Sequence, residues 1–199
     1  MQRSLNLPSR LATGVYARRM QVIVYVGVSI DGFIARPGGE VDFLDTEQPP
    51  ADDMGFGALL ERVDVLVMGR NTFDFVIDSG FDWPYGELPV RVATSRPLEL
   101  APELEATVAT VAGATGEIVA SLEAEGFATA YVDGGALAAT FFADDLVDEL
   151  VLTFVPVVIG DGIRLLGDTP GDLAFDHRAT TSDPNGFVQI RWDRRRPTE

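Results

Sequence analysis

The chain has 199 residues, 46% of them hydrophobic and 23% charged, which is the composition of a folded globular protein of one domain. It contains no cysteine, no lysine and a single histidine, His177. These counts exclude disulfides, thiolate metal sites, iron–sulfur clusters, lysine Schiff bases and multi-histidine metal centres. We therefore expect no metal site.

The net charge of −16 arises from 31 acidic and 15 basic residues, and every basic residue is arginine. A surface of this charge repels phosphate backbones, so we expect no binding to nucleic acid. The composition fits either a salty cytosol or a GC-rich genome, and both explanations stay open. No apolar stretch approaches the ~18 residues needed to cross a bilayer, and Arg10 lies where a signal peptide would be apolar. We expect a cytoplasmic protein that does not bind membranes.

Residues 1–19 show no hydrophobic periodicity, so we expect a flexible tail before a single domain over residues 20–196. Residues 22–28 (VIVYVGV) are almost continuously apolar and rich in β-branched side chains, which predicts a central strand buried on both faces. Residues 29–50 are polar and rich in proline and glycine, which predicts a long functional loop.

A helix capped by Asp52 is expected to extend to residue 62. The alternation then predicts strands over residues 63–68, 90–94, 107–111, 128–132 and 149–155, and helices over residues 71–77, 115–125 and 136–143. Residues 173–181 and 187–192 alternate like antiparallel strands joined by a turn. These elements predict an α/β fold, in which a mostly parallel mixed sheet has helices on both faces and antiparallel strands at its C-terminal end.

Two predicted strands end at glycine turns that open helices, one at Gly69-Arg70 and one at Gly134-Gly135. Unpaired N–H groups at a helix N-terminus attract phosphate, and glycine lets the phosphate approach closely. A third strand ends at Thr94-Ser95-Arg96, which offers a hydroxyl and a guanidinium. If the three ends share one carboxyl edge, a dinucleotide can lie across them, although each turn alone is also compatible with a plain tight turn.

Four segments resemble, in this order, the dihydrofolate reductase fold, and most closely its bacterial branch related to the C-terminal reductase domain of the bifunctional riboflavin-biosynthesis enzyme. They are residues 29–35 (SIDGFIA), 68–73 (MGRNTF), 94–96 (TSR) and 134–136 (GGA). Residues 148–156 and 160–166 are similar to the late strand and turn of that branch. The resemblance covers residues 20–192 and implies a single-domain fold of three layers.

The resemblance implies NADPH-dependent hydride transfer to a small planar heterocycle, pterin- or pyrimidine-like, as in dihydrofolate reductase or 5-amino-6-(5-phosphoribosylamino)uracil reductase. It places Asp31 beside the nicotinamide as a candidate catalytic residue, although Asp31 also suits a turn before Gly32. Matched residue by residue, the resemblance implies that Gly69, Arg70 and Thr72 bind the cofactor phosphates. It implies that Ser95 and Arg96 bind the adenosine 2′-phosphate. The pyrophosphate would be bound by Gly134, Gly135 and Ala136.

The substrate side is less determined by the resemblance. A carboxylate is expected on the helix after the long loop, where Asp53 is the catalytic candidate, facing a pocket alongside Phe56, and Asp52 more simply caps the helix. Trp83 is a candidate wall of the substrate pocket or plain packing. Tyr25 stands where the riboflavin branch commonly has a lysine, which argues against the riboflavin substrate.

Two other functions also fit the sequence, a non-catalytic nucleotide- or anion-binding module and a structural interaction protein without a cofactor. His177 stands far from every motif and is expected to be non-catalytic. We further expect a homodimer, because residues 151–159 contain more apolar surface than one sheet edge should expose.

Overall fold

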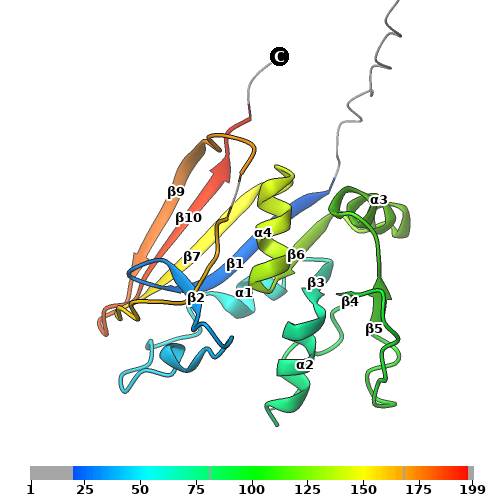
Figure 1. The fold of residues 1–199 in the computed structure, drawn as a ribbon, viewed down its shortest axis with the longest axis horizontal. Coiled ribbons are helices and arrows are strands. Elements are labelled where there is room, and N and C mark those ends of the chain that lie inside the picture. The colour runs from blue at the N-terminus through cyan, green and yellow to red at the C-terminus, as the bar shows by residue number, and fades with distance from the viewer. Residues whose placement is uncertain (1–19, 81, 168, 197–199) are drawn as a thin grey trace, which may run out of the picture.

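The computed structural model describes residues 20–80, 82–167 and 169–196. The tail predicted over residues 1–19 lies outside these ranges. Within them, ten strands, four α-helices and one 3-10 helix form an α/β fold (Figure 1).

Eight of the strands form one sheet in the order β5-β4-β3-β6-β1-β7-β10-β9. The strands from β5 to β7 are parallel to their neighbours, whereas β10 is antiparallel to β7 and to β9. The predicted mixed sheet with antiparallel C-terminal strands is therefore confirmed. The strands are β1 (Gln21–Ser29), β3 (Val65–Gly69), β4 (Val90–Ala93), β5 (Val108–Val111), β6 (Thr129–Asp133), β7 (Glu149–Val155), β9 (Phe175–Ser182) and β10 (Val188–Arg194).

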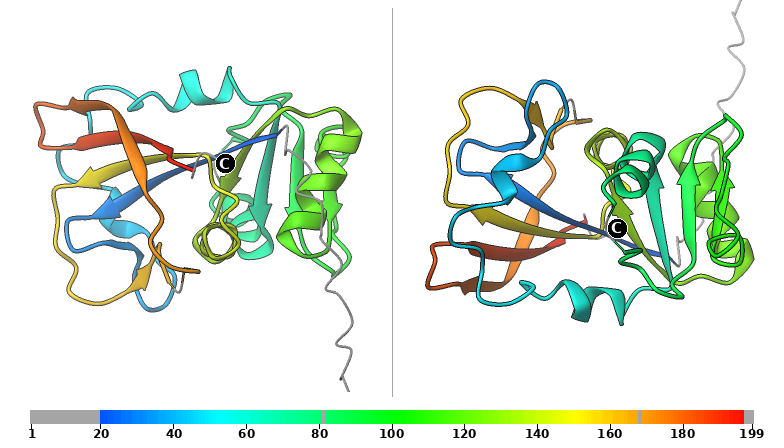
Figure 2. Two further views of the ribbon diagram at one scale, coloured as in Figure 1. Left: turned by 90° about the horizontal axis from the view of Figure 1, so that it is seen from above. Right: turned by 90° about the horizontal axis from the view of Figure 1, so that it is seen from below.

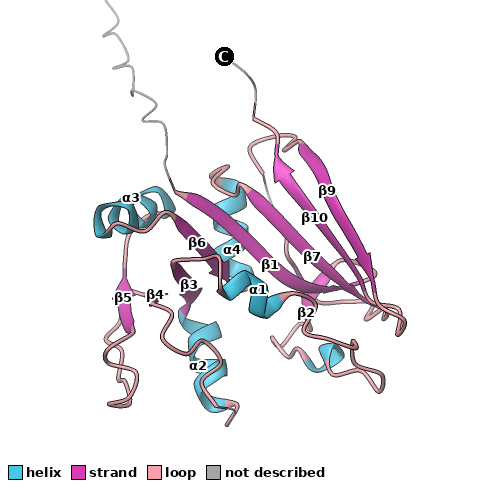
Figure 3. Ribbon diagram, turned by 180° about the vertical axis from the view of Figure 1, so that it is seen from behind, coloured by secondary structure: helices cyan, strands magenta, loops and turns pink. Residues whose placement is uncertain are grey.

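Helices cover both faces of the parallel part of the sheet. On one face α3 (Thr115–Glu125) and α4 (Gly135–Ala143) pack over the strands, and Leu122 and Phe141 join their core cluster. On the other face lies α1 (Phe56–Leu60), in front of the sheet in Figure 3, and Phe73 of α2 (Arg70–Asp78) belongs to the cluster on that face. Figure 2 shows α3 at one end of the sheet and β9 with β10 at the other.

The two most apolar strands lie at the centre of the core. Side chains alternate across a strand, so a strand covered on both faces needs apolar residues at successive positions. Residues 22–24 of β1 and 65–68 of β3 meet this requirement, and none of these side chains is more than 1% exposed. Burial of each side chain stabilises the fold by about 1.5–3 kcal/mol. Because such a strand needs a continuous apolar run, the sequence of residues 22–28 was enough to predict its central position.

A second sheet has two strands, one of which lies in residues 29–50, the segment that we expected to be a long loop. Strand β2 (Phe33–Ala35) pairs antiparallel with β8 (Ile163–Arg164), and the 3-10 helix η1 (Asp42–Leu44) follows. A Cβ on Gly162 would lie 2.2 Å from the carbonyl oxygen of Ala35, so only glycine permits this close approach. Strands of two or three residues are too short to show a period, which is why sequence analysis missed them.

Helix α1 is shorter than the predicted helix of residues 52–62, and Asp52 does not cap it. The N-cap is Gly55, whose φ of 82° lies in the left-handed region that favours glycine. Asp52 accepts the N–H of Met54, whereas the Asp53 carboxylate accepts the N–H groups of Gly55 and Gly57 at 2.9 and 2.8 Å. Asp53, and not Asp52 as predicted, therefore binds N–H groups at the start of this helix.

Strand β7 is an interior strand, so the apolar side chains of residues 151–155 belong to the sheet of one chain. It pairs with β1 on one side and β10 on the other. Val151 and Val155 are buried in the chain's own core. The homodimer stays a prediction, and of residues 151–159 it is Val158, 63% exposed, that offers apolar surface to a second copy.

Candidate functional site

Three strand ends that we predicted to bind phosphate lie side by side. Strands β4, β3 and β6 are parallel neighbours, with Gly69 level with Ala93 and Met68 level with Asp133. The two glycine turns and the Thr94-Ser95-Arg96 segment therefore share one carboxyl edge of the sheet. Such an edge is where α/β sheets bind nucleotides.

The two glycine turns contact each other closely. Gly134 has a φ of +94°, and a Cβ there would lie 2.3 Å from the Thr72 hydroxyl oxygen and 3.7 Å from the Gly69 nitrogen. A Cβ on Gly135 would lie 2.1 Å from Cδ1 of Ile34 in β2. The first turns of α2 and α4 thus meet where a side chain on Gly134 or Gly135 would clash, and we call this contact the cradle. Helix N-termini of this kind are suited to a pyrophosphate. Ala136, the next residue of α4, is exposed.

Arg70 lies at the predicted strand end, but its guanidinium is already engaged. Its Nε donates to Asp74 at 2.6 Å, and its Nη1 donates to the carbonyl of Pro97 at 3.1 Å. The charge of Arg70 is therefore largely balanced within the chain. Its second bond ties α2 to the loop that carries Ser95 and Arg96, so Arg70 positions that loop.

Arg96 has no such partner. Nine of the eleven arginines in the described ranges form an ion pair with a carboxylate, and Arg96 and Arg164 are the two that do not. Arg164 stacks over the Phe33 ring at 4.4 Å. Arg96 and Ser95 are exposed, and the Arg96 backbone N–H donates to the Thr94 hydroxyl. In a chain this acidic, an unpaired guanidinium at a strand end is suited to an anion.

Strand β1 extends beyond β6 and leaves a free edge beside the cradle. Pairing with β6 covers residues 21–24, whereas pairing with β7 covers residues 23–29. Among the described residues, no strand pairs with residues 26–28 on the β6 side. Their backbone groups there can bind the amide of a planar ligand, as unpaired strand edges do.

Asp133, the last residue of β6, is a candidate that sequence analysis missed. Burial raises the pKa of this carboxyl above its ordinary value, although hydrogen bonds from Gly134 and Tyr131 oppose the shift. The Asp133 charge also contributes to raising the pKa of Tyr85 and of Tyr131, in both cases after burial as the larger cause. Asp133 precedes the predicted Gly134-Gly135 turn directly, so its position at a strand end was the available signal.

An aromatic cluster of Tyr25, Phe56 and Tyr131 adjoins Asp133. Tyr25, Phe56 and Tyr131 form a triad with ring centroids 5.9 to 6.5 Å apart, and the Tyr131 hydroxyl donates to the Tyr25 carbonyl. Beside it, Trp83 contacts Tyr85 and Phe73 at 4.9 and 6.2 Å. The predicted substrate residues Phe56 and Trp83 therefore belong to one apolar cluster, which also contains Tyr131.

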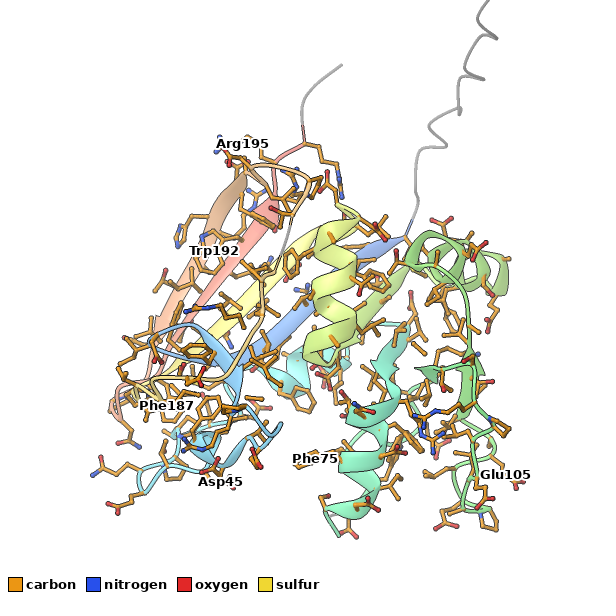
Figure 4. The ribbon with its side chains drawn as sticks, viewed as in Figure 1. Asp45, Phe75, Glu105, Phe187, Trp192 and Arg195 are labelled. Carbon is orange, nitrogen blue, oxygen red and sulfur yellow. The ribbon has the colours of Figure 1, made fainter. Side chains whose placement is uncertain are left out.

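Phe75 lies further along α2 and is 54% exposed. In Figure 4 it projects from α2 on the side of the loop that carries Asp45.

Hydrogen bonds to the Met54 carbonyl fix the backbone beside the aromatic residues Tyr25 and Phe56. The Met54 carbonyl accepts hydrogen bonds from the Tyr25 hydroxyl at 3.0 Å and from Gln189 Nε2 at 2.7 Å. Gln189 also contacts the Thr153 hydroxyl at 2.9 Å. Met54 has a φ of 51°, a conformation unusual for a residue with a side chain, and these bonds keep it there. Tyr25 therefore serves the local fold in this chain.

The two predicted catalytic aspartates are both bound to backbone N–H groups. Asp31 accepts from Gly160 at 2.8 Å and from Ile159 at 3.2 Å, which joins the end of β1 to the loop after β7. A hydrogen bond from the Ser29 hydroxyl, followed by these N–H groups, lowers the pKa of Asp31. The N–H groups of Gly57 and Gly55 lower the pKa of Asp53. Both carboxyls are therefore poor proton donors near neutral pH, whereas burial shifts the pKa of Asp133 in the opposite direction.

His177 lies on the edge strand β9, at the opposite end of the sheet order from the cradle, and pairs with the Thr180 hydroxyl. In the described part of the chain, no group of three or more acidic or histidine side chains is placed to hold a metal ion. No helix in those residues is both long and apolar enough to cross a membrane.

The chain is similar to known proteins in both sequence and structure. The sequence profile of the RibD C-terminal domain family matches residues 20–188. The uncharacterized protein YwjB of Bacillus subtilis strain 168 is 32% identical over 161 residues, which are 80% of this chain and 90% of YwjB.

Two solved structures extend the comparison. A protein from Shewanella sp. PV-4, named provisionally as a riboflavin biosynthesis protein, has a TM-score of 0.81 and 39% identity, covering 89% of this chain and 100% of that one. Dihydrofolate reductase from Enterococcus faecalis, in complex with NADP(H) and RAB-propyl, has a TM-score of 0.59 and 19% identity, covering 89% and 97% of the two chains. The latter likeness confirms the predicted fold.

Proposed function

Because the chain belongs to the RibD C-terminal domain family, we propose that it is an NADPH-dependent reductase that transfers hydride to a small planar heterocycle, pterin- or pyrimidine-like. The observation that supports this proposal is the alignment, on one carboxyl edge, of the three strand ends that we predicted to bind phosphate. The enterococcal reductase of the same fold is complexed with NADP(H), which supports the choice of cofactor.

The residues of the edge fit this cofactor. The first turns of α2 and α4 would bind the pyrophosphate through backbone N–H groups other than that of Gly134, which donates to Asp133 at 2.7 Å. A side chain at Gly134 would obstruct the cradle. Arg96 and Ser95 would bind the adenosine 2′-phosphate, because Arg96 is the cation there that no carboxylate balances. The free edge of β1 would orient the nicotinamide.

In the proposed mechanism the cofactor supplies the hydride, and this chain's residues supply position and a proton. Phe56, a partly exposed member of the aromatic cluster, would pack against the heterocycle near the end of β6. Asp133 would hold a proton on its carboxyl oxygen, since burial favours the neutral acid, and donate it to the ring atom next to the reduced carbon.

Removal of the Arg96 guanidinium tests the cofactor site. We expect Arg96→Ala to weaken NADPH binding about tenfold or more, because a charge-assisted hydrogen bond contributes about 1.5–3 kcal/mol. NADH lacks the 2′-phosphate, so its binding should stay nearly unchanged. Fluorescence titration of both cofactors measures the two affinities.

Arg178→Ala is the matched control, because it removes an equal charge from the edge strand β9, remote from the cradle. It should leave both affinities unchanged. Equal losses for NADPH and NADH in Arg96→Ala would assign Arg96 to the fold instead. A parental chain that binds no NADPH would refute the proposed reductase.

A non-catalytic nucleotide-binding module is the second candidate. The engagement of Asp31 and Asp53 with backbone N–H groups favours it, because only Asp133 is then left as a proton donor among the carboxyls considered. The two candidates differ in turnover: a chain that binds NADPH but oxidises it with no pterin or pyrimidine acceptor would be the binding module.

A further inference from the structure

Trp83 carries a buried polar group that the fold does not satisfy. In the described residues, two buried side-chain polar atoms lack a hydrogen-bond partner, Trp83 Nε1 and Glu149 Oε1. Arg191 Nε lies 3.4 Å from Glu149 Oε1 and balances its charge. The indole N–H of Trp83 has no comparable neighbour. Buried donors without an acceptor are rare because leaving them unpaired is unfavourable.

The position of Trp83 connects this donor with the proposed site. Its ring contacts Tyr85 at 4.9 Å, and the Asp133 charge reaches the Tyr85 hydroxyl. The indole therefore borders the same apolar cluster as the proposed proton donor. The Trp83 side chain as a whole is partly exposed, although its Nε1 is buried.

The fold offers the N–H one weak alternative. Trp83 and Tyr85 meet at 80°, close to edge-on, an arrangement that permits an N–H contact with an aromatic face. Such contacts are weaker than a hydrogen bond to a carbonyl oxygen. A ligand carbonyl would therefore displace the aromatic face as the acceptor.

We propose that the Trp83 indole N–H donates to a ring carbonyl of the substrate, which makes Trp83 a specificity-determining residue of the site. This inference rests on the proposed reductase function. Trp83 would bind the carbonyl edge while Asp133 serves the reduced bond. A site with a dedicated donor rejects analogues without the acceptor, because the donor would stay unpaired.

Binding of two lactam probes, uracil and pterin, tests the proposal. Calorimetric titrations are made on the full chain saturated with NADP⁺, so that no turnover occurs. We expect the parental chain to bind at least one probe, and Trp83→Phe to bind that probe about tenfold more weakly. Replacement of Trp83 by benzothienylalanine, which keeps the shape of indole but lacks the N–H, should give the same loss without disturbing the packing.

The chain offers a matched control, because its only other tryptophan is Trp192. Trp192 lies on β10, across the molecule from α2 in Figure 4. Trp192→Phe should bind the probes like the parental chain. It also leaves Trp83 as the only indole, whose emission should shift to longer wavelength when the carbonyl accepts its hydrogen bond.

The outcomes separate this inference from the function on which it rests. NADPH is titrated first, and a failure at that step refutes the reductase. The probes are then added to the chain alone, and the same comparison of variants decides the role of Trp83. Probe binding that the benzothienyl analogue leaves unchanged would overturn the inference, as would binding of NADPH with neither probe.

Discussion

At the scale of single residues, the pKa values of three carboxyls shift in opposite directions. Asp31 and Asp53 receive backbone N–H groups, which stabilise the charged form and lower the pKa. Asp133 is buried beside two tyrosines, and burial raises its pKa. Divergent pKa values within one site are the pattern by which proton donors are recognised.

Asp133→Asn should separate the catalytic role of this residue from its effect on stability. We expect turnover to fall about a hundredfold or more, because general acids contribute about 10²–10⁴-fold, while NADPH affinity is retained. An acid whose pKa is raised on folding destabilises the fold as pH increases from about 4 through the raised value. The variant should therefore melt higher than the parent above that window and show no such gain below it.

Asp53→Asn is the control, because its effect on the melting temperature should have the opposite sign. Its carboxylate stabilises the fold above the ordinary pKa of about 4, and this contribution is lost as pH falls through the lowered value. The variant should melt below the parent at neutral pH and converge with it in acid. Melting curves between about pH 3 and pH 8 record both variants, and identical profiles would contradict the assignment of Asp133.

At the scale of elements, the contact between the first turns of α2 and α4 is the feature most sensitive to substitution. Gly134→Ala would place a Cβ 2.3 Å from the Thr72 hydroxyl oxygen at a φ of +94°. We expect a loss of about 1–3 kcal/mol in the free energy of unfolding and weaker binding of both NADPH and NADH.

Gly116→Ala in α3 is the matched control, because a Cβ there meets no atom within 4 Å. It should stabilise the fold by about 0.5–1 kcal/mol and leave both affinities unchanged. Thermal unfolding and cofactor titration distinguish the two substitutions. Unimpaired cofactor binding by Gly134→Ala would contradict the cradle.

The sequence was most informative where local chemistry decides the structure. Continuous apolar runs marked the central strands β1 and β3, and the turns at Gly69 and Gly134 marked the cofactor edge. The short ribbon of β2 and β8 was missed, because it depends on pairing between residues some 130 positions apart. The raised pKa of Asp133 was also missed, because it arises from burial in the folded chain, which no local pattern around residue 133 shows.

At the scale of the whole molecule, the acidic surface should make stability depend on salt. The net charge of −16 repels itself within the compact state, and ions screen this repulsion. Screening also weakens the surface ion pairs, but these contribute little individually. We expect the melting temperature to rise with potassium chloride. A melting temperature that is constant or falls would show that the ion pairs outweigh the repulsion.

The predicted homodimer now needs a surface other than β7. Exposed apolar side chains gather where β1 and β7 end, with Ile30 58% and Val158 63% exposed. The Ile30 N–H donates to the Val157 carbonyl, so the two segments are adjacent. We predict that this surface joins two copies and that Val158→Asp produces monomers, whereas Ile77→Asp on α2 does not. Light scattering measures the masses, and a monomeric parent would refute the dimer.

The place of β1 in the sheet also has a consequence for synthesis of the chain on the ribosome. This strand is made first among the described elements, yet its neighbours are residues 129–132 and 149–155. At about 5–20 residues per second, its apolar run emerges several seconds before either neighbour. Such a segment is prone to aggregate while it is unpaired. The acidic residues that emerge in the interval keep the nascent chain apart from other chains, so the charge that weakens the finished fold protects it during synthesis.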